Sequence, residues 1–150
     1  MSNHIAFRGV GNMGNPMANQ LVKAGKDVKV FDISQDVIKI AKQSGLDVIN
    51  SMEELLQGAT TVISMLPEGK HVRSLYLGDN GIIKSIPKNC LIIDCSTIDI
   101  ETSLALGSEA KKIGIKMSGL GKEYAFDSMM NHFTQSKTIL INRGKSNIDV

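Results

Sequence analysis

The chain has 150 residues, of which 42% are hydrophobic and 21% charged, and its net charge at pH 7 is +2. These values are typical of a globular domain, and the scattered lysines without interleaved aromatic residues argue against a nucleic-acid partner. No apolar run is long enough to span a bilayer and no signal peptide is recognisable at the start, so we expect a cytoplasmic protein without a membrane segment.

The first part of the chain alternates between strand and helix patterns. Residues 4–10 predict a strand. Met13, Met17, Leu21 and Ala24 recur at spacings of four, four and three, which predicts a helix and places both methionines in the core. The next elements are expected to be a strand at 27–32 and a helix at 35–43, which Ser34 caps and Gly45 ends. A strand at 46–49 and a short helix at 53–57 follow, and Ser51 and Glu54 have the spacing of a capping box at the start of this helix.

The same alternation continues to residue 117. Residues 60–66 and 90–96 are nearly continuous apolar runs, which is typical of strands buried on both faces. Helices are predicted at 70–77 and 99–114, and 115–117 begins another extended segment. On the helix at 99–114, the residues expected to face inward are Leu104, Ala105, Ala110 and Ile113.

This order of elements predicts the fold class. Strands that alternate with helices imply right-handed crossovers and a parallel sheet covered on both faces. We predict an α/β protein of the Rossmann type, with one doubly wound domain over residues 1–117 and a divergent tail over 118–150. Within that tail, 137–142 could form one extra strand.

Cys90 and Cys95 lie at the two ends of one predicted strand. Side chains five residues apart on a strand point to opposite faces and cannot easily form a disulfide. We therefore expect two free thiols, which fits a reducing compartment. His4 and His132 show no spacing typical of metal ligands, and no metal is predicted.

A glycine-rich turn is the strongest functional signal. Gly9, Gly11 and Gly14 form G-x-G-x-x-G between a predicted strand and a predicted helix, and Asp32 ends the next strand at the expected distance. Such glycines allow a tight turn, a close approach of a pyrophosphate and close packing of helix on strand. The carboxylate would accept hydrogen bonds from the adenosine ribose and repel a 2′-phosphate, so NAD is favoured over NADP. The alternative is a glycine-rich turn without a ligand.

Arg8 does not fit a buried parallel strand, because burial of an unpaired guanidinium costs several kcal/mol. Its side chain could extend to the edge of the sheet, pair with a buried carboxylate, or destabilise the domain. We favour the first or the third outcome over a contact with phosphate.

Three collinear segments carry a family resemblance. "GVGNMGNPMANQL", "SMLPEGKHVRSLYLGDNGI" and "LIIDCSTID" resemble the motifs of 3-hydroxyisobutyrate dehydrogenases and the wider β-hydroxyacid dehydrogenase family, over about residues 4–117. The family transfers a hydride from the hydroxyl-bearing carbon of a β-hydroxyacid to NAD. Arg8, Val10 and Gln20 depart from the family pattern.

The resemblance also implies site residues. The pyrophosphate would be surrounded by Gly9, Gly11, Asn12, Met13 and Gly14, and the adenosine would contact Phe31 and Asp32. The nicotinamide side of the cofactor would contact Leu66, Pro67, His71 and Thr97. The substrate would contact Ser96. Without the family, His71 would be interpreted as a surface residue. Alternatively, Ser96 and Thr97 could simply cap the next helix, and Thr97 or Asp99 is expected to be its N-cap in either case.

The resemblance stops before the family's helical second domain, which carries the lysine used as general acid–base. Lys122 lacks the sequence context of that lysine and is not assigned its role, so the catalytic residue is unknown. We expect a cofactor-binding half that is truncated and inactive alone, with an exposed apolar face that could form a homo-oligomer. The alternatives are a non-catalytic NAD-binding or self-associating module and a non-functional remnant.

Overall fold

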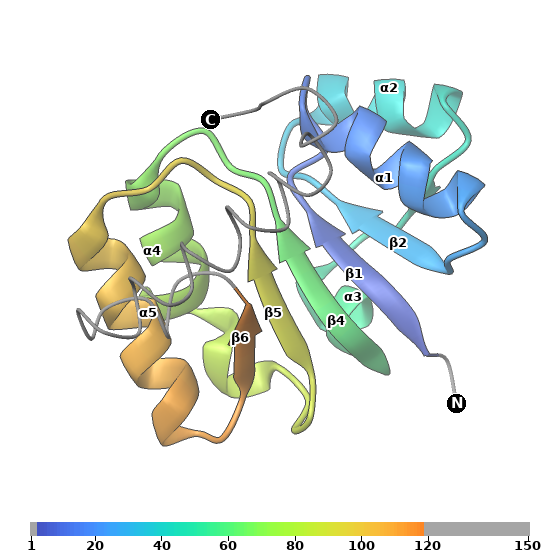
Figure 1. Cartoon of the computed structure of the whole chain (residues 1–150). Coiled ribbons are helices and arrows are strands. Elements are labelled where there is room, and N and C mark those ends of the chain that lie inside the picture. The colour runs from blue at the N-terminus through green and yellow to red at the C-terminus, as the bar shows by residue number, and fades with distance from the viewer. Residues whose placement is uncertain (1–2, 119–150) are drawn as a thin grey trace, which may run out of the picture.

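The structure is a computed structural model, and it describes residues 3–118. Six parallel strands form one sheet in the order β3-β2-β1-β4-β5-β6, and the arrowheads of the labelled strands point the same way in Figure 1. The strands are β1 (His4–Arg8), β2 (Val28–Phe31), β3 (Asp47–Val48), β4 (Ala59–Ser64), β5 (Leu91–Asp94) and β6 (Lys116–Ser118). This is the strand order of a Rossmann sheet, so the predicted fold class is confirmed.

Helices cover both faces of the sheet. The helices are α1 (Gly14–Lys23), α2 (Gln35–Gln43), α3 (Met52–Leu56), α4 (Gly69–Leu77) and α5 (Ile100–Lys112), together with a short 3₁₀ helix, η1 (Ile82–Ser85). α1 and α2 pack on one face, and α3, α4 and α5 pack on the other. In the part of the chain described, no helix combines the length and apolar character needed to cross a membrane.

Two apolar clusters separated by the sheet form the core. Along β1, Ala6 packs into the cluster under α3, α4 and α5, whereas Phe7 packs into the cluster under α1 and α2. Val62 and Ile63 of β4 divide between the clusters in the same way. The central strands are therefore buried on both faces, as their continuous apolar runs predicted.

Helix caps lie close to their predicted positions. The Ser34 hydroxyl accepts a hydrogen bond from the Val37 amide at 3.4 Å, and the Ser51 hydroxyl accepts one from the Glu54 amide at 3.1 Å. At the start of α5, the Asp99 carboxylate accepts from the Thr102 amide at 2.8 Å. Asp99, not Thr97, is therefore the cap of α5.

Two predictions about buried side chains are wrong. Leu104 is 44% exposed, because the inward stripe of α5 runs through Ser103, Leu106 and Ala110 at spacings of three and four. Met13 is 61% exposed, because it precedes the first turn of α1 and lies at the mouth of a cleft instead of in the core. Cys90 is buried and Cys95 is exposed, and both are free thiols as expected.

The junction between β1 and α1 requires two of the three glycines in the turn. Gly9 has a φ of +91°, and a Cβ there would lie 2.3 Å from the Met65 carbonyl oxygen. A Cβ at Gly14 would lie 1.9 Å from the Gly9 carbonyl oxygen. A Cβ at Gly11, by contrast, would meet no atom of the described residues within 4 Å. Gly9 and Gly14 are thus required by packing, whereas Gly11 leaves open space.

These contacts predict different effects on stability. Gly14→Ala should lower the free energy of unfolding by at least about 2 kcal/mol, because the new methyl group overlaps a backbone oxygen that cannot move freely. Gly11→Ala is the matched control and should change it by less than about 0.5 kcal/mol. Urea denaturation of both variants measures the difference, and equal losses would contradict this account of the turn.

Candidate functional site

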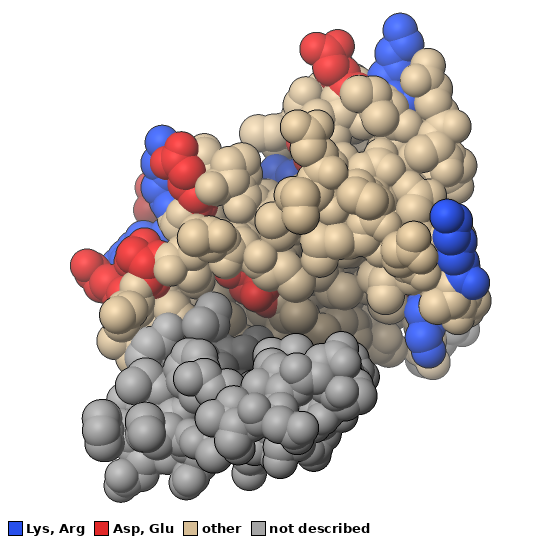
Figure 2. Space-filling view, turned by 45° about the horizontal axis from the view of Figure 1, so that its top comes forward, with Lys and Arg blue, Asp and Glu red and all other residues tan. Residues whose placement is uncertain are grey.

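A cleft opens at the carboxyl ends of β1, β2 and β4, with a volume of about 660 Å³ that is in the usual range for ligand sites. Its lining is formed by the glycine turn, the segments that follow β2 and β4, and one face of α4. The lining residues are Arg8, Gly9, Gly11, Asn12, Met13, Gly14, Asp32, Ile33, Ser34, Val37, Met65, Leu66, Pro67, His71, Ser74 and Leu75. Figure 2 tilts this edge of the sheet toward the viewer, and most of the surface there is uncharged.

The glycine turn lies beneath the N-terminus of α1. No side chain caps this end of α1, and its first turn contains no acidic residue. A helix N-terminus with accessible amides attracts anions, and the open space at Gly11 lets a phosphate approach the backbone. The turn therefore fits a pyrophosphate, and this fit rests on its backbone instead of on charged side chains.

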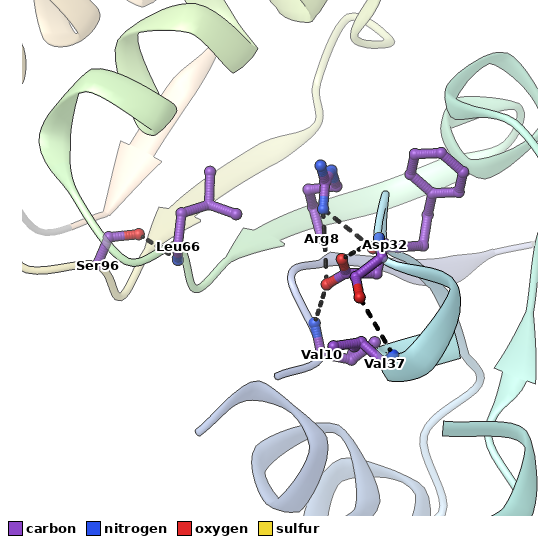
Figure 3. A network of polar contacts seen from close by, with 8 residues as sticks. Arg8, Val10, Asp32, Val37, Leu66 and Ser96 are labelled. Atoms are coloured by element: carbon purple, nitrogen blue, oxygen red, sulfur yellow. Dashed lines mark hydrogen bonds and ion pairs between the residues drawn. The ribbon is translucent and has the colours of Figure 1, made fainter. Parts of the chain in front are cut away.

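Asp32 is held at the opposite wall of the cleft by two backbone amides. Its Oδ2 accepts from the Val10 amide and its Oδ1 from the Ser34 amide, each at 3.0 Å (Figure 3). The carboxylate thus connects the glycine turn to the start of α2. The carboxylate also lines the cleft, and a sugar hydroxyl there could donate to its remaining lone pairs.

Arg8 takes the outcome that the sequence analysis did not favour. Its side chain is only 9% exposed, so it does not extend to the edge of the sheet. Nη1 lies 3.8 Å from Oδ2 of Asp32 (Figure 3) and 3.5 Å from the Phe31 carbonyl oxygen, and Cζ lies 5.3 Å from the centre of the Phe31 ring. Burial lowers the pKa of Arg8, while the Asp32 charge acts in the opposite direction. Arg8 therefore pairs with a buried carboxylate inside the cleft.

The third wall of the cleft comes from β4 and α4. Leu66 and Pro67 follow β4, and His71 lies on the face of α4 that also carries Ser74 and Leu75. The structure thus brings together nine of the eleven predicted cofactor residues, Gly9, Gly11, Asn12, Met13, Gly14, Asp32, Leu66, Pro67 and His71.

Phe31 and Thr97 do not line the cleft. Phe31 packs its ring beneath Arg8, and its carbonyl oxygen accepts from the Gly9 amide at 3.1 Å. Its contribution is to position neighbouring residues. Thr97 is exposed beyond the end of β5.

Ser96 belongs to a hydrogen-bonded chain between the ends of β4 and β5. Its hydroxyl accepts from the Leu66 amide at 2.8 Å and donates to Oδ1 of Asp94 at 2.8 Å (the first of these bonds is drawn in Figure 3). Tyr76 donates to the Ser64 hydroxyl at 2.9 Å, and Ser64 donates to the same Asp94 oxygen at 2.6 Å. This chain holds the segment that lines the cleft after β4.

Burial raises the pKa of the Asp94 carboxyl, although the hydrogen bonds from Ser64 and Ser96 act in the opposite direction. Its buried Oδ2 has no hydrogen-bond partner among the described residues. Burial also raises the pKa of the fully buried Tyr76 hydroxyl, so Tyr76 stays protonated throughout the physiological range and keeps its hydrogen bond to Ser64.

The sequence analysis missed several residues that line the cleft. Ile33, Ser34 and Val37 follow β2. They could have been predicted, because ligands of open parallel sheets bind beyond the carboxyl ends of the central strands, and β2 is one of these strands. Ser74 and Leu75 follow His71 at spacings of three and four, so the helix period would have placed them beside it. The sequence identified Arg8 as unusual, but its position on a strand did not determine which way its side chain points.

A family profile described as the NAD binding domain of 6-phosphogluconate dehydrogenase matches residues 4–121. The chain is 44% identical over 113 residues to a 3-hydroxyisobutyrate dehydrogenase of Pseudomonas aeruginosa, and 40% identical over 113 residues to an NAD-dependent L-serine dehydrogenase of the same organism. Each alignment covers 75% of this chain and 38% of the relative. The chain thus spans little more than a third of the length of these relatives.

A solved structure shows the same arrangement. Mycobacterium tuberculosis 3-hydroxyisobutyrate dehydrogenase, determined with L-serine, superposes with a TM-score of 0.70 at 35% sequence identity. The superposition covers 83% of this chain and 44% of that chain.

The environment of Asp94 predicts a pH effect on stability. Because the folded-state pKa is raised, the native state binds more protons than the unfolded chain, and ionisation of Asp94 lowers stability as pH rises from about 4 through the folded pKa. Asp94→Asn removes this titration. The free energy of unfolding of the variant, relative to wild type, should therefore increase with pH over this window.

Denaturation at several pH values measures this difference. Asp79→Asn, at an exposed position, is the control and should give a profile parallel to that of wild type. A parallel profile for Asp94→Asn would contradict the assignment. The comparison uses the slope of the free energy of unfolding against pH, because the side-chain amide introduced by Asp94→Asn also alters hydrogen bonding at every pH.

Proposed function

The chain belongs to the family of NAD binding domains of the 6-phosphogluconate dehydrogenase type, and from this we propose that its cleft binds NAD as the cofactor part of a β-hydroxyacid dehydrogenase. The observation that carries the proposal is the open space above Gly11, between the uncapped N-terminus of α1 and the fixed carboxylate of Asp32. That combination provides amides for a diphosphate and an acceptor for a sugar.

Each part of the cleft has a role in this proposal. The amides between Gly9 and Gly14 would hold the pyrophosphate, and Asp32 would accept hydrogen bonds from the adenosine ribose. Leu66, Pro67 and His71 would bound the nicotinamide side. NAD supplies a hydride acceptor when it is bound.

The proposed substrate class is a small β-hydroxyacid of the 3-hydroxyisobutyrate type. Two observations support it: the relatives carry the names 3-hydroxyisobutyrate dehydrogenase and L-serine dehydrogenase, and both named substrates are small acids with a hydroxyl on the β carbon. Ser96 lies beside the segment after β4, through its bond with the Leu66 amide. Ser96 itself does not line the cleft, so its proposed contact with the substrate rests on the family resemblance.

We propose further that the base that removes the hydroxyl proton lies outside residues 3–118. Among the titratable side chains that line the described cleft, Arg8 and Asp32 pair with each other at the ribose side, and His71 is exposed at its rim. A base for hydride transfer needs hydrogen-bond reach of the substrate hydroxyl and contributes about 10²–10⁴-fold to the rate.

Cofactor binding is tested by titrating the purified chain with NADH and following nicotinamide fluorescence. Wild type should saturate. Gly11→Val should weaken NADH binding by at least about tenfold, since its side chain would fill the space where the phosphates approach. Ala24→Val, on the exposed end of α1, is the control and should bind like wild type. Saturation by Gly11→Val with wild-type affinity would overturn the proposed site.

Catalysis is tested by following NADH formation with 3-hydroxyisobutyrate and with L-serine. The 150-residue chain should show no turnover above background while it still binds NADH, because none of residues 3–118 supplies the base and Lys122 is not assigned that role. Turnover that disappears in Lys122→Ala would contradict this expectation and assign the base to the tail. The NADH titration is the positive control for a folded, competent protein.

A further inference from the structure

We propose that Arg8 sets how the cleft discriminates between dinucleotides with and without a phosphate on the adenosine ribose, and that it lets the chain accept NADP as well as NAD. This inference rests on the proposed function, since it concerns the cofactor that the same cleft would bind. It concerns a residue that departs from the motifs the chain otherwise shares with its family.

The guanidinium is buried but only weakly engaged by the protein. Its contacts to Asp32 and to the Phe31 carbonyl, at 3.8 and 3.5 Å, are long for an arginine that could form short bidentate bonds. Nε is buried and has no hydrogen-bond partner among the described residues. A side chain that is nine-tenths buried and lines a cleft with unused donors is suited to an anion that enters the cleft.

The charge of the cleft supports the same conclusion. The described lining contains one guanidinium, from Arg8, and one carboxylate, from Asp32, and their opposite charges lie 3.8 Å apart. Asp32 alone would repel a 2′-phosphate strongly, because both groups are anionic and lie in a partly buried site. With Arg8 beside it, the carboxylate still accepts hydrogen bonds from a ribose, but its long-range repulsion of a phosphate is largely cancelled.

The position of the pair also matches the end of the dinucleotide that carries the 2′-phosphate. In Rossmann sheets, the acidic residue after the second strand binds the ribose hydroxyls, whereas a nearby arginine accommodates a 2′-phosphate. Here both groups occur together, one at the end of β2 and one at the end of β1. The Ser34 hydroxyl, at the N-terminus of α2, lines the same end of the cleft.

A simpler interpretation is that Arg8 serves only the fold, by pairing with Asp32. Under that interpretation, an apolar residue of similar length would leave the relative affinity for the two dinucleotides unchanged. The ratio of the two dissociation constants therefore separates the interpretations, whereas stability or affinity for one cofactor alone does not.

The test measures dissociation constants of NADH and NADPH for wild type, Arg8→Leu and Arg8→Lys by fluorescence titration. For wild type we expect the constant for NADPH to lie within about tenfold of that for NADH, and for Arg8→Leu we expect the ratio to rise by about tenfold or more, because Asp32 is then uncompensated. Arg8→Lys retains the charge and should give a ratio close to that of wild type.

A second measurement does not depend on the nicotinamide end. Calorimetry with adenosine 2′,5′-bisphosphate and with 5′-AMP should show the same change in preference on Arg8→Leu, and Arg8→Met replaces Arg8→Leu if the latter unfolds. A ratio that changes by less than about twofold in these variants would overturn the inference while leaving NADH binding, and the proposed function, intact. Absence of saturable binding of NADH to wild type would overturn both.

Discussion

The cleft depends on one close backbone contact, between Gly9 at the end of β1 and Gly14 at the start of α1. The Gly9 carbonyl oxygen occupies the place where a side chain at position 14 would begin. This contact brings the N-terminus of α1 directly over the end of the central strand, so that the amides of its first turn face the cleft. A larger residue at position 14 would displace α1, and the anion-binding geometry would be lost together with the packing, whereas a larger residue at position 9 would collide with Met65 and Leu66 after β4.

Two carboxylates hold the segments that leave the two central strands. Asp32, after β2, accepts from the Val10 amide in the turn that follows β1. Asp94, at the end of β5, accepts from Ser96, whose hydroxyl in turn accepts from the Leu66 amide after β4. In both cases a neighbouring strand supplies the acceptor for a loop that would otherwise leave its amide unpaired. The walls of the cleft are therefore positioned by the sheet itself, and the site needs few additional side chains.

The sequence predicted those features that depend on hydrophobic periodicity, helix-capping residues and the spacing of glycines. The strand and helix order, the caps at Ser34 and Ser51 and the glycine turn follow from local rules, and the structure confirms them. Prediction from the sequence failed where the outcome depends on distant neighbours. The inward face of α5 is determined by its packing against α4 and β6, so Leu104 lies outside while Ser103 is buried. Arg8 could be recognised as unusual, but only tertiary structure shows that Asp32 lies next to it.

The pairing of Arg8 with Asp32 makes the two residues depend on each other. Removal of the carboxylate would leave a guanidinium buried without a compensating charge, which costs more than the pair contributes. A variant of Asp32 with weak cofactor binding would therefore combine a lost ribose contact with a perturbed fold. Replacement of Arg8 by an apolar residue leaves Asp32 held by the amides of Val10 and Ser34, so the carboxylate keeps its place. The arginine, and not the aspartate, is consequently the position at which charge in the cleft can be changed with its geometry preserved.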